Sequence, residues 1–247
     1  LQIPEYKIPI VEIKTDFDIQ IFIKREDLIH PKISGNKFWK LFFNVNQYLE
    51  SNHENPLIIT FGGAFSNHVA SVSAFGKEFG IPTIGIIRGN ELENNWQENP
   101  TLSEASKNGM QLIFVSREDY QNKEKLTQKF SKKYPNALII PEGGSNEMAV
   151  EGVRYMLGED TKDFDYLCTA LGTGGTIAGI SRFAEDHQKV VGIKVVKDNS
   201  LEKTIQEWSR RNNFELIDAD ESRYGKITDE NIRFINWFYK KYQIPLD

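Results

Sequence analysis

The sequence has one cysteine among its 247 residues, so no disulfide bond can form within the chain. It contains no apolar run that approaches the roughly 20 residues a membrane-spanning helix needs. It also lacks an excess of basic residues, since 30 Lys and Arg stand against 35 Asp and Glu, a formal net charge of −5. A mildly acidic chain with scattered basic residues is a poor candidate for binding nucleic acid or anionic membranes. We therefore expect neither kind of partner.

No targeting signal is recognisable at the amino end, where residues 1–14 match neither a signal peptide nor a transit peptide. Together with the single thiol, this predicts a cytoplasmic protein. The thiol belongs to Cys168, in the apolar run 166–171, which indicates a buried strand. Because no cationic residue flanks it in sequence, we expect an inert core cysteine rather than a reactive one.

Short apolar runs alternate with longer amphipathic stretches along most of the chain. Several apolar runs are continuous, as expected for strands buried on both faces of a parallel sheet. The predicted strands are 57–61, 83–87, 111–115, 137–140, 166–171, 190–196 and 214–217. The predicted helices begin near Asn36, Ser66, Asn99, Arg117, Ser145, Thr176, Leu201 and Thr228. This order predicts an α/β protein with doubly wound open sheets, which bind ligands in the turns at the carboxyl ends of their strands.

One such turn, Gly172-Thr173-Gly174-Gly175-Thr176, lies between a predicted strand and a predicted helix. Glycine allows positive φ and close approach of a ligand to the main chain. The first-turn N–H groups of a helix carry partial positive charge. With two threonine hydroxyls, the pattern favours a cradle for a dianionic phosphate over a plain turn capped by Thr176. No Walker lysine and no G-x-G-x-x-G pattern is present, which disfavours a nucleotide-binding protein.

A second motif, Ser34-Gly35-Asn36-Lys37, opens the amphipathic stretch 38–49. A lysine is disfavoured at a helix start, and this position would help to lower the pKa of its amine. A lysine that forms an imine must become neutral, so the placement suits that chemistry. Taken alone, however, the motif favours an ordinary surface lysine on a first turn.

Two further glycine turns follow predicted strands. Gly62-Gly63-Ala64-Phe65-Ser66-Asn67-His68 brings three polar side chains to one strand tip, although Ser66 or Asn67 could be only a helix cap. Pro141-Glu142-Gly143-Gly144-Ser145-Asn146 is either a capped tight turn or a wall of the same cleft. A lone histidine such as His68 is more often structural than catalytic. No second ligand has metal-binding spacing with it, so we expect no metal.

Five motifs follow one another along the chain: Lys24-Arg25-Glu26-Asp27-Leu28, Ser34-Gly35-Asn36-Lys37, Gly62-Gly63-x-x-Ser66-Asn67-His68, Pro141-Glu142-Gly143-Gly144-Ser145-Asn146 and Gly172-Thr173-Gly174-Gly175-Thr176. In this order they resemble the 1-aminocyclopropane-1-carboxylate (ACC) deaminase/D-cysteine desulfhydrase family. Members of that family use pyridoxal 5′-phosphate (PLP) and have the tryptophan synthase β-subunit-like fold, fold type II. The resemblance runs from Lys24 to the end of the chain, and it reverses the interpretation of Lys37 as a surface residue.

The resemblance implies a role for each matching position. Lys37 would be the Schiff-base lysine and would move a proton at the substrate's α-carbon. The 172–176 loop would hold the cofactor phosphate, and Asn67 would bond to the cofactor's ring hydroxyl. Ser66 would contact the substrate's carboxylate or its leaving part. Three further residues are candidates for the substrate pocket: His68, Trp96 and Tyr224.

The implied fold has two α/β lobes with the cofactor between them. The smaller lobe would be residues 48–145, and the larger would combine 1–47 with 146–247. Two departures from the family stand out. Phe65 replaces a frequent glutamine, and relatives continue past Asp247 with a second pocket tyrosine and a hydroxyl that faces the pyridine nitrogen. We expect the chain to be incomplete rather than to lack these parts. Tyr224 could also be only a turn aromatic.

The implied activity is that of a PLP-dependent lyase or deaminase on a small amino acid, in a homodimer. D-Cysteine would yield pyruvate, ammonia and hydrogen sulfide, whereas ACC would yield 2-oxobutanoate and ammonia. Histidine after Ser66-Asn67 favours the desulfhydrase branch slightly. The alternatives are a serine/threonine dehydratase-like enzyme and a non-catalytic PLP-binding relative.

Overall fold

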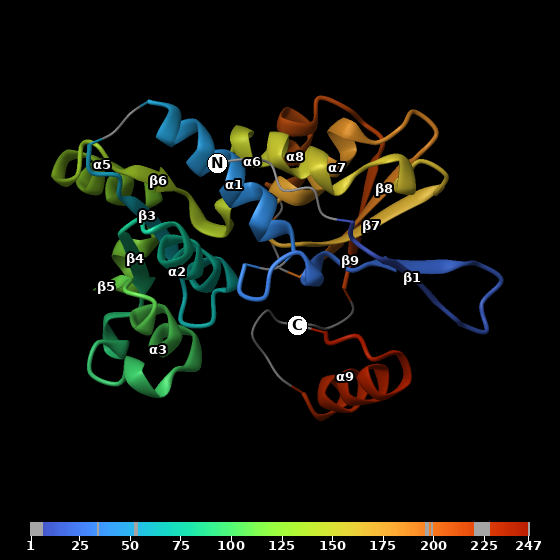
Figure 1. Ribbon diagram of the computed structural model, residues 1–247, viewed down its shortest axis with the longest axis horizontal. Coiled ribbons are helices and arrows are strands. Elements are labelled where there is room, and N and C mark those ends of the chain that lie inside the picture. The colour runs from blue at the N-terminus through green and yellow to red at the C-terminus, as the bar shows by residue number, and fades with distance from the viewer. Residues whose placement is uncertain are drawn as a thin grey trace.

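The computed structural model of the chain describes residues 7–33, 35–51, 54–195, 198, 200–219 and 228–246. Two parallel sheets form the framework of this part, with a short antiparallel hairpin beside the second sheet (Figure 1). The strand orders are β5-β4-β3-β6 in the first sheet and β7-β8-β9 in the second. Every strand pair within these two sheets is parallel. The predicted α/β class with open parallel sheets is therefore confirmed.

All seven predicted strands are present, with ends within two residues of the prediction. The first sheet contains β3 (Ile58–Gly62), β4 (Thr83–Arg88), β5 (Gln111–Val115) and β6 (Leu138–Ile140). The second contains β7 (Tyr166–Leu171), β8 (Lys189–Lys194) and β9 (Phe214–Asp218). The hairpin pairs β1 (Ile10–Ile13) with β2 (Ile21–Lys24). The prediction missed this hairpin, because strands of four residues with partly exposed side chains have little sequence pattern.

Helices connect the strands of both sheets. The α-helices are α1 (Asn36–Glu50), α2 (Asn67–Phe79), α3 (Pro100–Lys107), α4 (Arg117–Gln121), α5 (Lys123–Lys133), α6 (Glu147–Val153), α7 (Gly175–Phe183), α8 (Leu201–Ser209) and α9 (Asp229–Tyr242). Short 3-10 turns are η1 (Glu26–Leu28), η2 (Asn90–Leu92), η3 (Trp96–Glu98), η4 (Glu142–Gly144), η5 (Arg154–Met156) and η6 (Glu159–Thr161). None of the described helices is both long and apolar enough to cross a membrane.

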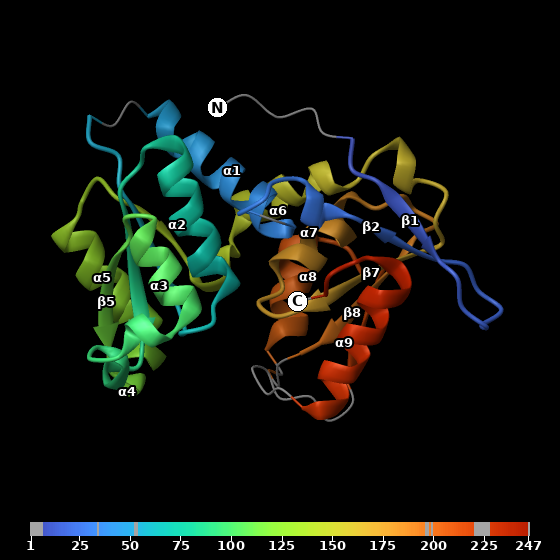
Figure 2. The ribbon, with the colours of Figure 1, turned by 60° about the horizontal axis from the view of Figure 1, so that its bottom comes forward.

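Helix α1 lies between the two sheets in both views (Figures 1 and 2). Its buried aromatic residues, such as Phe38 and Phe42, belong to the core of the first sheet. Its other side packs on α6, where a side chain on Gly152 would overlap the carbonyl oxygen of Trp39. Gly179 similarly allows α7 to approach α6, since an added Cβ would lie 2.5 Å from the Val153 Cβ. Close helix packing thus holds the start of α1 beside the start of α7.

The strands of the first sheet all fall within the predicted smaller lobe, 48–145, and those of the second fall within 146–247. Helix α1 crosses the boundary predicted at residue 48 without a break. The exact lobe boundaries therefore stay a prediction.

The prediction of a buried strand at Tyr166–Leu171 is wrong for most of its length. Side chains alternate between exposed and half-buried up to Ala170, Leu171 is buried, and Cys168 is exposed. Within the described residues β7 pairs with β8 alone, so it is an edge strand of its sheet. An apolar run does not reveal whether a strand lies at the centre or the edge of a sheet, which is why the expected core thiol is accessible here.

Candidate active site

A cavity of about 2400 Å³ opens between the two sheets, at the carboxyl ends of their strands. The turns after β3, β6 and β7 all contribute to its wall, as does the start of α1. Predicted site residues that line the cavity are Lys37, Ser66, Asn67, His68, Gly172, Thr173, Gly174 and Thr176. The structure therefore brings together motifs that are far apart in the sequence.

The turn from β7 into α7 has the geometry of an anion cradle. Gly174 has φ +85°, a backbone conformation that residues with a side chain rarely adopt. A Cβ added to Gly172 would meet nothing within 4 Å, so open space lies next to the main chain there. The first N–H groups of α7 follow directly at Gly175 and Thr176. Thr176 is the second residue of the helix rather than its cap, so its hydroxyl is not used on its own backbone.

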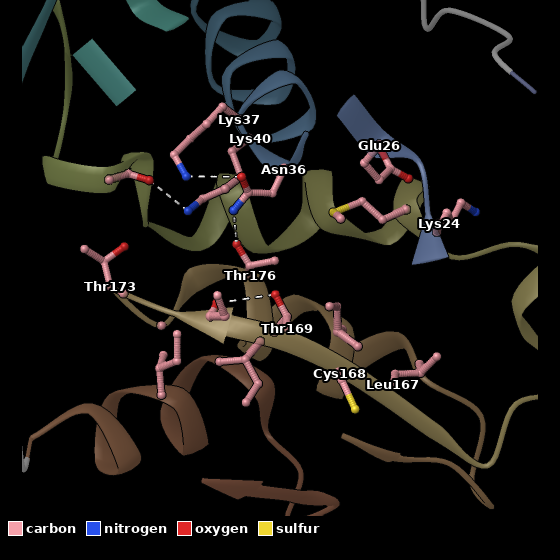
Figure 3. Close-up of a pocket in the computed structure, with 18 of the residues that line it drawn as sticks. Lys24, Glu26, Asn36, Lys37, Lys40, Leu167, Cys168, Thr169, Thr173 and Thr176 are labelled. Carbon is pink, nitrogen blue, oxygen red and sulfur yellow. Dashed lines mark hydrogen bonds between the residues drawn. The ribbon is translucent and has the colours of Figure 1, made fainter. Parts of the chain in front are cut away.

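The first turn of α1 faces this loop (Figure 3). Gly35, with φ +63°, ends the preceding turn and donates its N–H to the Glu26 carbonyl oxygen at 2.9 Å. Asn36 Nδ2 donates to Thr176 Oγ1 at 2.6 Å, across 140 positions of sequence. Lys37 Nζ donates to Asn36 Oδ1 at 3.1 Å. Asn36 thus ties the lysine amine and the loop hydroxyl into one hydrogen-bonded unit.

A second lysine, one helical turn after Lys37, is connected to the same loop through hydrogen bonds. Lys40 is 2% exposed, and its Nζ donates to Gly143 O at 2.8 Å and Ser145 Oγ at 2.9 Å. Ser145 Oγ lies 2.6 Å from Thr173 Oγ1. Burial, and after it the charge of Lys37, lowers the pKa of Lys40 well below its usual 10.5. This network joins α1, η4 and the glycine loop.

These hydrogen bonds leave donor capacity in the loop. Thr176 Oγ1 accepts from Asn36, so its proton is not used in that bond. Ser145 Oγ accepts from Lys40, and in its contact with Thr173 Oγ1 either hydroxyl can donate. Two hydroxyls and main-chain N–H groups, with the amine of Lys37 close by, form a donor set that fits a dianionic phosphate.

His68 lies at the start of α2 and is 2% exposed. Thr60 Oγ1 donates to the Ile140 carbonyl oxygen, so it accepts from His68 Nε2, 2.8 Å away. His68 Nδ1 is buried and has no hydrogen-bond partner in the described part of the chain, and the ring lies where a side chain on Gly144 would stand. Burial, followed by the charges of Lys37 and Lys40, lowers the pKa of His68 well below 6.5. The imidazole is therefore neutral, and it connects α2 to β3 and η4.

Glu26 fixes the approach to α1, a role that the sequence did not suggest. It is 8% exposed, and its Oε2 accepts from Trp39 Nε1 at 3.0 Å. Its Oε1 is buried and has no partner among the described residues, and Glu26 lines the cavity. Burial raises the pKa of this carboxyl, and the Trp39 hydrogen bond opposes the shift in part. Side chain and backbone of Glu26 thus hold both Trp39 and Gly35, on either side of Lys37.

Of the remaining predicted site residues, some line the cavity and others do not. Ser66 caps α2, since its Oγ accepts from the Val69 N–H, and it lines the cavity beside Asn67. Trp96 packs against the core of the first sheet and is not part of the cavity wall. Tyr224 lies outside the described residues, as does Ser34. Within the described part of the chain, no three His, Cys, Asp or Glu side chains are grouped to hold a metal ion.

Comparison with known proteins gives a consistent pattern. The sequence model of a family described as pyridoxal-phosphate dependent enzyme matches residues 2–233. A Thermotoga maritima protein, provisionally named a 1-aminocyclopropane-1-carboxylate deaminase, is 30% identical over 198 residues, 74% of this chain and 61% of that protein. The mitochondrial bifunctional D-cysteine desulfhydrase/1-aminocyclopropane-1-carboxylate deaminase of Arabidopsis thaliana is 30% identical over 66% of this chain and 44% of its own length.

A solved structure shares the whole architecture. The crystal structure of an ACC deaminase homologue superposes with a TM-score of 0.83 at 25% identity, covering 98% of this chain and 80% of that one. The matches to the Thermotoga and Arabidopsis proteins span 61% and 44% of their lengths, so this chain corresponds to only part of each.

Proposed function

Because this chain belongs to the family of pyridoxal-phosphate-dependent enzymes, we propose that it is a lyase or deaminase that acts on a small amino acid. The fold and the cofactor predicted from the sequence are those of this family. The reaction is that of a D-cysteine desulfhydrase, giving pyruvate, ammonia and hydrogen sulfide, or that of an ACC deaminase, giving 2-oxobutanoate and ammonia. The Arabidopsis relative, whose name carries both activities, supports this pair.

One observation carries the proposal: the amine of Lys37 and the hydroxyl of Thr176 are joined through Asn36 on the wall of one cavity. The 172–176 loop fits the phosphate of PLP, and the lysine lies beside it to hold the aldehyde end. When bound, PLP supplies an electron sink for the substrate's α-carbon. No lysine from another part of the fold is needed to hold the aldehyde end of the cofactor.

The roles of the protein's own residues follow from this placement. Lys37 anchors the cofactor and carries a proton to or from the substrate's α-carbon. The hydroxyls of Thr173 and Thr176 contact the phosphate, with Ser145 bonded to the first and Asn36 to the second. Asn67 holds the cofactor's ring hydroxyl and Ser66 the substrate's carboxylate. Neutral His68 supports the turn that carries both, and histidine at this position favours D-cysteine over ACC.

Purified protein tests the proposal directly. Loaded with PLP, it should be yellow, and borohydride should bleach the colour. D-Cysteine, ACC and D- and L-serine are offered separately, and keto acid and sulfide are measured. Lys37→Ala should abolish colour and turnover, whereas Lys32→Ala, which removes an exposed partner of Glu104, should change neither. Turnover by the Lys37→Ala protein would refute the proposal.

The same assay separates the alternatives. Keto acid from serine alone would indicate a serine/threonine dehydratase-like enzyme, and bound PLP without any keto acid would indicate a non-catalytic binder. We also propose a cytoplasmic homodimer, which sedimentation and cell fractionation would test.

A further inference from the structure

Arg88 is a cavity residue with no part in the proposed chemistry. It is the last residue of β4, and the pairing of Ile87 with Gly62 places it beside the glycine turn that follows β3. Its side chain is exposed and lines the cavity. It therefore stands on the wall formed by the first sheet, at the edge where parallel sheets bind ligands.

The guanidinium of Arg88 is held by packing. A Cβ added to Gly63 would lie 3.2 Å from Arg88 Nη2, so the absence of a side chain at Gly63 leaves room for it. Its Cζ lies 5.6 Å from the centre of the Tyr120 ring, in cation–π range. Tyr120 is 2% exposed, and its hydroxyl donates to Glu142 Oε1 at 2.9 Å. Arg88 therefore lies beside a ring that is buried and hydrogen-bonded.

Two carboxylates of this wall already have other partners. Arg117 Nε donates to Glu91 Oε1 at 2.8 Å. Glu142 accepts from Tyr120 and pairs with Lys123 Nζ at 3.0 Å. Across the described ranges, Arg88 has neither an ion pair nor a hydrogen-bond acceptor. A fixed cation that faces a cavity, with its N–H groups unused, is complementary to an anionic ligand.

Arg88 and the amine of Lys37 belong to different walls of the cavity. Arg88 ends β4 in the first sheet and lies against Gly63, in the turn after β3. Lys37 Nζ is tied through Asn36 to Thr176, which follows β7 of the second sheet. An anionic group bound at Arg88 would therefore lie on the first-sheet wall, apart from the α-carbon that Lys37 serves in the proposed function.

We propose that Arg88 binds a carboxylate at the end of the substrate's side chain. This rests on the proposed function of the cavity and narrows the substrate class to amino acids with a second, remote carboxylate. The guanidinium fork matches a carboxylate with two parallel hydrogen bonds. S-Carboxymethyl-cysteine is the simplest sulfur-containing member of this class.

The reaction of S-carboxymethyl-cysteine needs only water as a co-reactant. The Cα–H and Cβ–S bonds break, and sulfur leaves with the bonding electron pair and takes a proton, giving thioglycolate. Water then hydrolyses the remaining three-carbon unit to pyruvate and ammonia. No oxidant or reductant is needed.

Binding is measured with analogues that cannot react. In 2-aminoadipate a methylene replaces the sulfur, and its side-chain amide is a neutral control of the same shape. Calorimetric titration of the PLP-loaded protein with each, as both enantiomers, should show about 10- to 100-fold tighter binding of the acid. Arg88→Met should reduce this preference to about 2-fold or less, and Arg88→Lys should leave an intermediate value.

Arg117→Met is the matched control, since Arg117 lines the same cavity but is paired with Glu91. It should retain the preference for the acid. Equal binding of acid and amide by the unaltered protein, or an unchanged preference in Arg88→Met with normal PLP colour and melting temperature, would overturn the proposal. Keto-acid release from S-carboxymethyl-cysteine is measured in parallel. If the protein prefers the acid but releases keto acid from no substrate, the proposal of a carboxylate site at Arg88 stands and the proposed lyase activity is refuted.

Discussion

Gly175→Ala is expected to destabilise the cofactor-free protein and to weaken PLP binding. The new Cβ would lie 2.6 Å from Ser145 Oγ and 2.9 Å from Ser145 Cβ. A rotamer change moves only the first of these atoms, so the backbone of η4 or α7 has to shift. Such overpacking costs about 1–3 kcal/mol. Displacing Ser145 also weakens its bonds to Lys40 and Thr173, at about 1 kcal/mol each.

The total is about 3–5 kcal/mol. For a chain of this size each kcal/mol lowers the melting temperature by about 2–4 °C, so a decrease of roughly 6–20 °C is expected. Scanning calorimetry of the PLP-free protein measures it, and a PLP titration followed by absorbance measures the affinity. Affinity should decrease because Thr173 loses its hydrogen-bond partner Ser145.

Gly172→Ala is the control, three positions away in the same loop. A Cβ there meets no protein atom within 4 Å, so the cofactor-free protein should melt within about 0.5 kcal/mol of the unaltered one. Its PLP affinity should nevertheless decrease, because the methyl group enters the space next to the cradle. The reasoning is refuted if Gly175→Ala melts like the unaltered protein, or if the two variants lose equal stability.

Two further predictions concern titration and access. The lowered pKa of His68 means that the unfolded chain binds a proton below pH 6.5 while the folded chain does not, so stability should be lost as pH falls through 6.5, by up to about 1.4 kcal/mol per pH unit. Urea unfolding at pH 7.5 and 5.5 should show a smaller loss for His68→Gln, and an identical loss in both proteins would contradict this. Cys168 should react with a thiol reagent in the folded protein, one group per chain and more slowly than free cysteine because burial raises its pKa. If Cys168 were labelled only after denaturation, the thiol would be inaccessible in the folded protein and the prediction would be wrong.

Local patterns predicted the elements of this fold well. Short apolar runs rich in β-branched residues, such as Ile58–Gly62, indicated strands, and Ser, Asn and Thr residues cap several of the helices. The exact cap was harder to assign, since Asn146 rather than Ser145 accepts from the first turn of α6. Ser145 is used elsewhere, in the bond to Thr173.

Side chains that support the site were harder to predict than those in its motifs. Lys40 follows Lys37 by three positions, so helical spacing alone could have placed both on one face of α1. Glu26 is part of a quoted motif, but only its burial against Trp39 gives it a role. Trp96 was chosen from a loosely matching neighbourhood, and it packs into the core of the first sheet instead.

The order of motifs along the chain was sufficient to predict the family and the cofactor, because glycine turns and caps depend on neighbouring residues only, and Lys37 as the lysine that holds the cofactor stays a prediction. Tertiary structure alone decided that Asn36 meets Thr176, that Lys40 reaches Thr173 through Ser145, and that β7 is an edge strand within the part of the chain that the structure describes. Those contacts join residues more than 100 positions apart, or 28 in the case of Ser145 and Thr173. They exist because α1, α6 and α7 pack closely enough to bring three helix starts to one point, and such packing leaves no local trace in sequence.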